Sequence, residues 1–303
     1  MTKTERLVGC IIGGAIGDAW GSAFENLQIK TNANTYYLGE KKYHEPEWSF
    51  TDDTQLTLIT LEALIQSEFV TSEYLANKFV ENFERKRIDG IGSSTLKALQ
   101  ELQAGGHWSQ VGRTGEYAAG NGAAMRIAPF AFWDDYTKEE IRNFCRITHR
   151  NDEAYAGALA VIVSLRLIIN ETWNGNENLI ELIIPHLPDT NVRDRLIELN
   201  KLNVYDPISK AAEFGTNGYV VNSIPFSIFA ASQVSKIGIE NMFREIIKCG
   251  GDTDTNASIA GQIAGSLLGE KNIPANLKDK LQTVPGVRWL NETIEKAVER
   301  LSK

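Results

Sequence analysis

Apolar side chains recur three or four residues apart through most of the chain, which is the spacing of one face of a helix. Between positions 55 and 66, for example, Leu56, Ile59, Ala63 and Leu64 fall on one side. The same period predicts helices over 72–83, 93–103, 138–148, 152–169, 178–184, 192–203, 224–235, 239–248, 256–268, 274–283 and 290–301. Strand-like alternation is scarce, so the pattern predicts one all-α domain over residues 1–303, a compact multi-helix bundle.

Four glycines near the N-terminus follow the same helical spacing. Gly9, Gly13, Gly17 and Gly21 recur at every fourth residue. Each glycine costs a helix about 1 kcal/mol relative to alanine, so four in register indicate a packing or site requirement. On a helix they form a smooth stripe against which another backbone can pack closely; a glycine-rich loop is the alternative.

The apolar stretch at positions 7–16, which Lys3 and Arg6 precede, needs to be distinguished from a secretory signal. It is rich in glycine, it ends at Asp18, and Trp20 stands where a small-residue cleavage site would be needed. No other window approaches the roughly 18 apolar residues of a membrane span. We therefore expect neither a signal peptide nor a membrane segment.

Cysteine usage and charge limit the partners further. Cys10, Cys145 and Cys249 are far apart and lack CxxC spacing, so neither a disulfide framework nor a zinc site is indicated. We expect a cytoplasmic protein, and a monomer. The net charge is -8, with 39 acidic and 31 basic side chains, and a chain of that charge is not expected to bind duplex nucleic acid.

Residues 28–48 are polar and irregular and predict a long surface loop between the first two helices. Loops of that length are often functional lids or simply mobile. The sequence leaves both interpretations open.

Two acidic clusters stand at predicted helix starts. In the first, Thr51 precedes Asp52 and Asp53, which suits an N-cap followed by carboxylates in the first turn. In the second, a Gly-Gly pair precedes Asp252 and Asp254. On a regular helix, side chains two residues apart point in directions that differ by about 200°. These two carboxylates therefore converge only if Asp252 lies on the turn before the helix.

A shared metal site would explain both clusters. Carboxylate and hydroxyl oxygens without histidine or cysteine suit Mg, Mn or Ca rather than Zn. Two carboxylates about 4 Å apart repel by roughly 4 kcal/mol at an effective dielectric near 20, so four brought together need cations. Two divalent ions would balance four aspartates, which favours a binuclear centre; two independent helix caps are the alternative.

With these residues identified, the chain resembles the ADP-ribosylglycohydrolase family, from Gly9 to about Gly269. Six motifs stand in the family's order: 13–21 with Glu25, 51–54, 120–126, 148–149, 218–221 and 250–255. Each is weak alone, but together and in register they are specific.

The resemblance implies an orthogonal all-α bundle with two Mg or Mn ions in a cleft. It assigns the metal ligands to Thr51, Asp52, Asp53, Asp252, Asp254 and Thr255. It also implies that a loop wraps the diphosphate and distal ribose of ADP-ribose, with Gly120, Asn121, Gly122, Ala123 and Met125 as its contact residues. By the same resemblance Tyr219 stacks near the adenine, and Glu25 stands near the metals as a gate or proton carrier.

The residue chemistry is compatible with these roles and leaves alternatives. Gly120 and Gly122 let backbone N–H groups approach a pyrophosphate, and Asn121 tolerates a left-handed conformation, so the segment can form an anion-binding nest or an ordinary turn. His149 either touches a ribose or phosphate or caps a helix. Tyr219 is either a stacking platform or part of the core.

The roles of four further residues are less clearly indicated by the sequence. Asp18 either supports the metal ligands or bonds a helix terminus, and we favour the second. His44, His107 and His186 have no partners at ligand spacing and are expected on the surface or in the core.

The family resemblance implies an ADP-ribosylglycohydrolase, which hydrolyses the bond between the distal ribose and an acceptor. We hypothesise that Asp52 or Asp53 holds and deprotonates the attacking water while Glu25 moves protons or closes over the substrate. Arginine-linked ADP-ribose is the favoured substrate, on a protein or a small conjugate, and Glu116 is the only acidic residue just before the glycine loop. Serine-linked or O-acetyl-ADP-ribose, ADP-ribose polymers, a non-catalytic ADP-ribose-binding module and a phosphohydrolase that cuts the pyrophosphate are the alternatives.

Overall fold

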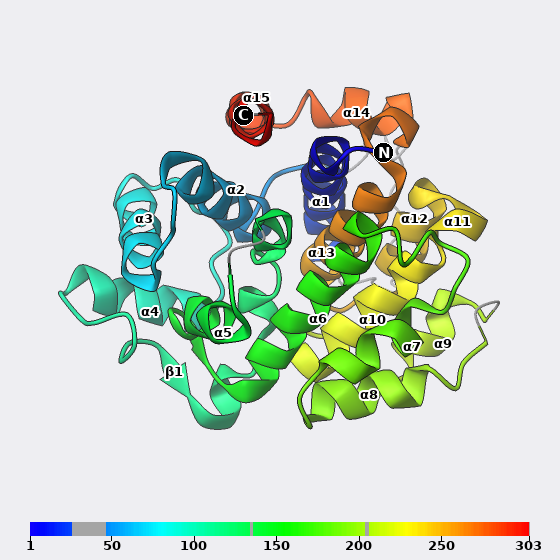
Figure 1. Ribbon diagram of the computed structural model, residues 1–303, viewed down its shortest axis with the longest axis horizontal. Helices are drawn as coiled ribbons and strands as arrows, with labels where there is room; N and C mark the ends of the chain where they lie inside the picture. Colours follow the sequence, from blue (N-terminus) through cyan, green and yellow to red (C-terminus); the bar gives the residue numbers. More distant parts are fainter. Residues whose placement is uncertain (26–46, 134–135, 204–205, 303) are drawn as a thin grey trace, which may run out of the picture.

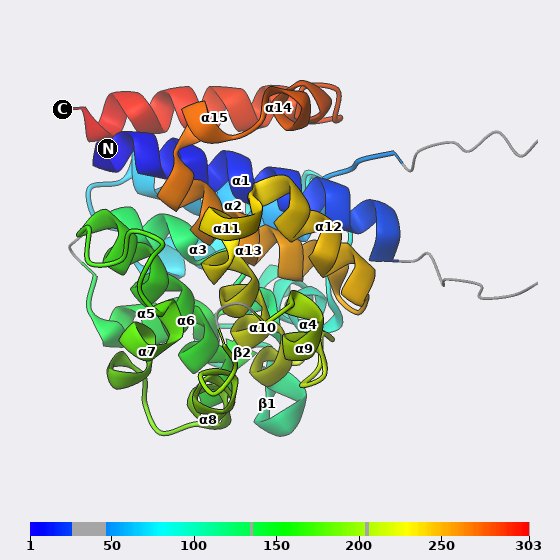
Figure 2. The same cartoon turned by 90° about the vertical axis from the view of Figure 1, so that its right-hand side faces the viewer.

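Two antiparallel helices, α1 (Lys3–Glu25) and α13 (Thr253–Leu268), form the centre of the molecule (Figure 1). The structure is a computed structural model that describes residues 1–25, 47–133, 136–203 and 206–302. On one side of the central pair lie α2 (Asp52–Gln66), α3 (Ser72–Glu84) and α4 (Ser93–Gln103). On the other side lie α10 (Val220–Ser232) and α12 (Ile239–Cys249), and α15 (Val287–Leu301) runs alongside α1 (Figure 2).

The other elements fill the lower half of the view in Figure 1 or connect the larger helices. The remaining α-helices are α5 (Lys138–Arg146), α6 (Asp152–Ile169), α7 (Leu179–Ile183), α8 (Asn191–Leu199), α9 (Ile208–Ala212), α11 (Val234–Ile237) and α14 (Ala275–Leu281). Short 3₁₀ turns are η1 (Gly115–Ala118), η2 (Asn121–Ala123), η3 (Ala128–Phe132), η4 (Ile184–His186) and η5 (Glu270–Asn272). Among the described residues one small sheet pairs β1 (Arg113–Thr114) in parallel with β2 (His149–Arg150). The predicted all-α class is confirmed.

The glycine stripe is the contact between the two central helices. A Cβ atom on any of the four glycines would lie within 2.3 Å of a carbonyl oxygen of α13. The carbonyls opposite Gly9, Gly13, Gly17 and Gly21 belong to Gly265, Gly261, Ala257 and Thr253, in that order. Backbone contact over this length fixes the register of the two helices. It brings the C-terminal end of α1 to the N-terminal end of α13, where the second acidic cluster begins.

Helix α1 is long and apolar enough to cross a membrane by composition, but 72% of its most apolar window is buried inside the protein. The predicted surface loop at 28–48 lies outside the described residues except for its last two, Glu47 and Trp48.

Helix boundaries differ from the prediction where polar residues cap an end. Helix α2 starts at Asp52 rather than at 55, because Thr51 caps it and accepts a hydrogen bond from the backbone N–H of Asp53. Helix α5 ends at Arg146 rather than at 148, which releases His149 into strand β2. His149 therefore caps no helix; the N-cap of α6 is Asn151.

Candidate functional site

A cavity of about 490 Å³ opens where α1, α2, α4, α13 and the glycine loop meet. Most of the predicted site residues line it, namely Glu25, Asp52, Gly120, Asn121, Gly122, Met125, His149, Asp252, Asp254 and Thr255. Thr51, Asp53, Ala123 and Tyr219 are not part of its wall. Thr51 and Asp53 lie beneath the wall, in contact with the acidic residues, whereas Tyr219 lies outside it.

Two carboxylate clusters with one residue in common occupy this region. Asp18, Asp53 and Asp254 each offer an oxygen within 4.8 Å of the others, and so do Glu25, Asp252 and Asp254. Asp53 Oδ1 is buried and has no hydrogen-bond partner among the described residues. Such an arrangement of hard oxygen donors, with an orphaned buried oxygen among them, fits divalent cations such as Mg or Mn.

Asp18 joins the first cluster to the start of α2. Its buried carboxylate accepts hydrogen bonds from the backbone N–H of Thr51 (3.0 Å) and of Thr54 (3.1 Å) and from the Thr51 hydroxyl (2.7 Å). Asp18 therefore bonds a helix terminus, the interpretation that the sequence favours, and it also lies among the carboxylates that could hold a metal ion, a role that stays a prediction. Residue type and position alone could not show this, since the two roles depend on how α1 crosses α2.

Asp252 lies on the turn before α13, which is the condition under which it converges with Asp254. It is the N-cap residue, with φ -82° and ψ 75°. Gly250 and Gly251 precede it with positive φ values of 69° and 83°. A Cβ atom on Gly251 would lie 2.3 Å from the Thr216 hydroxyl oxygen, so the tight approach requires glycine there.

Two side-chain hydrogen bonds connect the acidic residues to neighbouring elements. The Thr255 hydroxyl donates to Asp53 Oδ2 (3.0 Å), which links the starts of α13 and α2. The Asn121 side-chain amide donates to Asp252 Oδ2 (2.7 Å). Asn121 thus supports a candidate metal ligand directly, a role the sequence did not suggest.

The acidic residues are costly to ionise without cations. Burial, reinforced by the neighbouring carboxylates, raises the pKa of Asp52 to about 7 and raises the pKa values of Asp53, Asp254 and Glu25 as well. Bound divalent ions would reverse this effect, because a nearby positive charge favours the ionised form. The electrostatics therefore agree with the metal interpretation of the clusters.

The glycine loop differs from the predicted nest. The described backbone shows no positive φ at Gly120, Asn121 or Gly122, and the segment forms the 3₁₀ turn η2. The backbone N–H of Asn121 donates to the carbonyl oxygen of Gly218 (3.1 Å) and is not directed at a ligand. The segment therefore has the ordinary turn that the sequence left open as the alternative to a nest.

Glycine is required at positions 120 and 122 for another reason, which is the space that a neighbouring side chain occupies. A Cβ atom on Gly120 would lie 3.1 Å from Nε2 of His149, and one on Gly122 would lie 2.8 Å from its Cε1. The loop therefore lacks side chains where the imidazole packs against it. His149 is 3% exposed, and burial together with the charge of Arg126 lowers its pKa to about 3.

The model of one protein family, described as ADP-ribosylglycohydrolase, matches residues 1–303. The chain belongs to the ADP-ribosylglycohydrolase family. Its members named below are ADP-ribosylhydrolases, and this chain is accordingly a glycosidic-bond hydrolase.

Individual relatives agree with the family assignment. The chain is 29% identical to the protein named ADP-ribosylarginine hydrolase Tri1 of Serratia proteamaculans, over 91% of this chain and 75% of the relative. It is 24% identical to ADP-ribosylhydrolase ARH3 of Gallus gallus, over 89% of this chain and 87% of the relative. A solved structure titled "ADP-ribosylglycohydrolase-related protein complex" matches with a TM-score of 0.66 at 23% identity, over 99% of both chains, and confirms the fold.

Tyr219 lies at the edge of this hydrolase's cavity rather than in the core. It is 42% exposed and pairs with Gly120 through an isolated antiparallel bridge. The backbone around it holds the loop, since Val220 N–H donates to the carbonyl oxygen of Ala119 (2.9 Å). The core interpretation of Tyr219 is wrong, and the stacking role stays a prediction.

One wall of the cavity was missed by the sequence reasoning. Gly90, Gly92, Ser93, Ser94 and Thr95 line it at the start of α4. The backbone N–H of Gly92 points toward Asp52 Oδ2 at 3.4 Å. A cluster of glycine, serine and threonine directly before a helical period is a helix-start signal, and it could have indicated a third helix N-terminus at the site.

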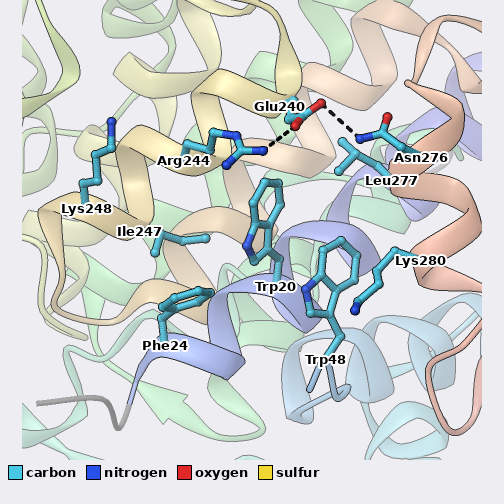
Figure 3. A pocket seen from close by; sticks show the side chains of 10 residues that line it. All are labelled: Trp20, Phe24, Trp48, Glu240, Arg244, Ile247, Lys248, Asn276, Leu277 and Lys280. Carbon is cyan, nitrogen blue, oxygen red and sulfur yellow. Dashed lines mark hydrogen bonds and ion pairs between the residues drawn. The ribbon is translucent and has the colours of Figure 1, made fainter. Parts of the chain in front are cut away.

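A second cavity, of about 580 Å³, lies across α1 from the acidic one (Figure 3). Trp20 of α1 stacks on Trp48 with ring centroids 5.5 Å apart, and the Arg244 guanidinium lies 5.4 Å from the Trp20 ring. The one carboxylate in its wall, Glu240, is paired with Arg244 at 2.6 Å and also accepts a hydrogen bond from Asn276. This cavity is larger, but the described part of its wall holds no cluster of carboxylates like the two in the acidic cavity.

Proposed function

We propose that the chain uses two divalent cations, Mg or Mn, to release ADP-ribose from arginine-linked ADP-ribose on protein. The observation that carries the proposal is the pair of carboxylate clusters that share Asp254 in the wall of the cavity. Two overlapping sets of hard oxygens within one cavity suit two neighbouring cations better than one.

The ligand set proposed from the sequence gains one member. Thr51, Asp52, Asp53, Asp252, Asp254 and Thr255 would hold the cations, with Asp18 as a further carboxylate. Asp18 lies within 4.8 Å of Asp53 and Asp254, oxygen to oxygen. When bound, the cations would hold the ribose hydroxyls and acidify a water molecule.

Asp52 is the best placed of the predicted bases. Its side chain lines the cavity at 7% exposure, and its pKa is raised to about 7 by burial. That value belongs to the metal-free protein; with cations bound, Asp52 would be ionised at neutral pH and could accept the proton of a water molecule that the cations acidify. Asp53 lies deeper, hydrogen-bonded to Thr255, and is better suited to ligation.

Glu25 stands at the exposed end of α1 in the same wall, and we assign it the proton for the leaving group. In the reaction the bond between the anomeric carbon and the guanidine nitrogen breaks, and its electron pair stays on nitrogen. The nitrogen takes up a proton, while the water oxygen bonds to the anomeric carbon and gives its proton to Asp52.

The choice of arginine as acceptor has two supports. The Serratia relative carries the name ADP-ribosylarginine hydrolase. Glu116 is exposed in η1, and the carbonyl oxygen of the next residue, Tyr117, accepts a hydrogen bond from Ser94 in the wall of the cavity (3.4 Å), so Glu116 lies near the edge of the cavity. A carboxylate there can attract a guanidinium leaving group.

The test is an assay of defined arginine-, serine- and O-acetyl-linked ADP-ribose with Mg, with Mn and with EDTA. We expect free ADP-ribose from the arginine conjugate, in the presence of either metal and not in EDTA. Release of AMP would instead identify a phosphohydrolase, and preference for another linkage would reject arginine. Glu116→Gln should raise KM for the arginine conjugate alone; equal effects on all three conjugates would reject its proposed role.

We also propose that the enzyme is a cytoplasmic monomer. All three cysteines are free; Cys10 and Cys145 are buried and Cys249 is half-buried. Free thiols of this kind are typical of a reducing compartment. Cell fractionation and light scattering test the two parts of this proposal separately.

A further inference from the structure

His149 lies in the wall of the acidic cavity, and only one of its two ring nitrogens has a hydrogen-bond partner recorded among the described residues. Nδ1 lies 2.8 Å from the Thr148 hydroxyl oxygen. For Nε2 the structure records no hydrogen bond among the described residues, although the residue is 97% buried and lines the cavity. A buried side chain that lines a cavity and has one ring nitrogen without a recorded protein partner indicates a ligand.

The Thr148 hydroxyl has its own fixed donor. Arg126 is 2% exposed, and its Nη2 donates to Thr148 Oγ1 at 2.8 Å. Nη1 of the same guanidinium donates to the carbonyl oxygen of Gly122, in the loop on which His149 packs. Arginine stays protonated and can only donate, so the direction of the first hydrogen bond is certain.

The rest of the chain of hydrogen bonds follows from counting protons. A threonine hydroxyl has one proton, and no acceptor for it other than His149 Nδ1 is recorded among the described residues. If Nδ1 carried a proton, two donors would point at Thr148 Oγ1 and the hydroxyl proton would be buried without a partner. The Thr148 hydroxyl therefore donates to Nδ1, and the ring proton resides on Nε2.

From this geometry we infer that Arg126 and Thr148 are positioning residues that lock His149 as the neutral Nε2–H tautomer, which donates a hydrogen bond to an oxygen of the bound substrate and never acts as a base. The inference rests on the proposed function for the identity of that substrate. Both the pyrophosphate and the ribose of ADP-ribose offer acceptor oxygens. Burial and the Arg126 charge keep the pKa of His149 near 3, so the ring stays neutral beside the carboxylates.

A neutral donor has a specific advantage in this cavity. A protonated imidazole would compete with the cations for the carboxylates and form ion pairs with them. A neutral ring leaves the carboxylates to the metals and still offers one directed N–H to an anionic or hydroxyl oxygen. Glycine at 120 and 122 leaves the ring edge accessible, because a side chain at either position would meet it.

The direct test is the nitrogen spectrum of the histidine rings in the full-length, Mg-loaded enzyme labelled with ¹⁵N-histidine. The chain has only 4 histidines, and His149→Gln identifies the resonances of His149 by their loss. We expect a protonated Nε2, an unprotonated Nδ1 and no titration between about pH 5 and 8. A protonated Nδ1, or titration near pH 6.5, would overturn the inference.

Thr148→Val tests the positioning role, with Thr148→Ser as the matched control that keeps the hydroxyl. We expect the valine variant to give mixed tautomers and about a tenfold higher KM, with kcat changed less than about threefold. The serine variant should restore both the tautomer and KM. An unchanged tautomer or KM in a folded valine variant would overturn the positioning role, and if that variant does not fold, the wild-type spectrum still decides.

The spectra also separate this inference from the proposed function. If the enzyme uses another acceptor or needs no metal, the proposed function fails, while the ring nitrogens still report the tautomer. If the tautomer is wrong but arginine-linked ADP-ribose is cleaved in a metal-dependent reaction, only the inference about His149 fails.

Discussion

Helix α1 separates two cavities that are similar in size but differ in the side chains that line them. On one side Asp18 and Glu25 each belong to a cluster of carboxylates; Glu25 lines the cavity, Asp18 is buried, and burial raises the pKa of both. On the other side Trp20 and Phe24 face half-exposed aromatic and basic side chains, and the single carboxylate Glu240 is neutralised by Arg244 (Figure 3).

The difference shows that cavity size does not identify the site. In the larger cavity the carboxylate of Glu240 is paired with Arg244. In the acidic cavity several carboxylates lie close together with no basic side chain recorded in the described wall. Unbalanced buried charge is unfavourable for folding and persists where a ligand or a reaction requires it. The acidic side of α1 is therefore the side on which we expect the chemistry, and the following predictions test this contrast.

The largest effect is expected from removing the carboxylate that both clusters share. Asp254→Ala should lower ADP-ribose release by on the order of 10³-fold, because cations supply several kcal/mol of transition-state stabilisation and each 1.36 kcal/mol is tenfold in rate. The rate of product release under saturating Mg or Mn measures it. The matched control is Glu240→Gln, a carboxylate change in the other cavity, which should leave the rate within about twofold. Equal losses in both variants would remove the distinction between the two sides.

The next largest effect concerns the backbone contact that fixes the register of α1 against α13. Gly17→Ala places a Cβ atom 2.1 Å from the carbonyl oxygen of Ala257, so backbone must move. We expect a loss of about 3 kcal/mol in the free energy of unfolding, measured by urea denaturation. Gly14→Ala is the milder control, because its Cβ would meet the Gln262 side chain, which can move more easily than backbone. A Gly17→Ala protein as stable as the control would contradict the backbone contact.

The acidic side should also make the stability of the metal-free enzyme depend on pH. Asp52 has a folded pKa of about 7, above the ordinary value of 3.8, so stability is fully present below pH 3.8 and is lost as pH rises through 7. The free energy of unfolding in EDTA should therefore fall by on the order of a few kcal/mol between about pH 4 and 7, and Tm should fall with it. Saturating Mg should flatten this slope, and Asp52→Asn should reduce it. Glu240→Gln should leave it unchanged; a slope that is the same with and without Mg would count against the metal site.

The smallest effect is expected on the aromatic side. Trp48→Leu removes the stacking on Trp20 and should cost about 1 kcal/mol of stability, with turnover little changed. Thermal unfolding and the ADP-ribose assay measure the two quantities. A loss of turnover comparable to that of Asp254→Ala would show that this cavity takes part in the reaction.

The sequence predicted the helical class and the two acidic clusters because both depend on local patterns. Two helices, α4 and α6, have the predicted bounds to the residue. The convergence of Asp252 with Asp254 was also foreseen, conditional on a turn at Asp252 that the two preceding glycines provide.

What the sequence could not provide depends on how distant segments meet. The double role of Asp18 requires α1 to cross the start of α2, and the hydrogen bond from Asn121 to Asp252 joins segments that are 131 residues apart. His149 was placed at the end of a helix because α5 has a regular period, whereas the structure has it on β2 beside Arg113. The sequence predicts that the glycines of the loop allow a special backbone conformation, whereas in the structure they leave room for an imidazole from another segment.

The central claim is that the two clusters sharing Asp254 hold two cations that the reaction requires. Calorimetric titration of the metal-free enzyme with Mn²⁺ tests it most directly, with Asp254→Ala titrated in parallel. The account predicts two equivalents bound by the wild-type enzyme and the loss of both at the same concentrations in the variant. Fewer than two equivalents in the wild type, or two equivalents retained by Asp254→Ala, would contradict it.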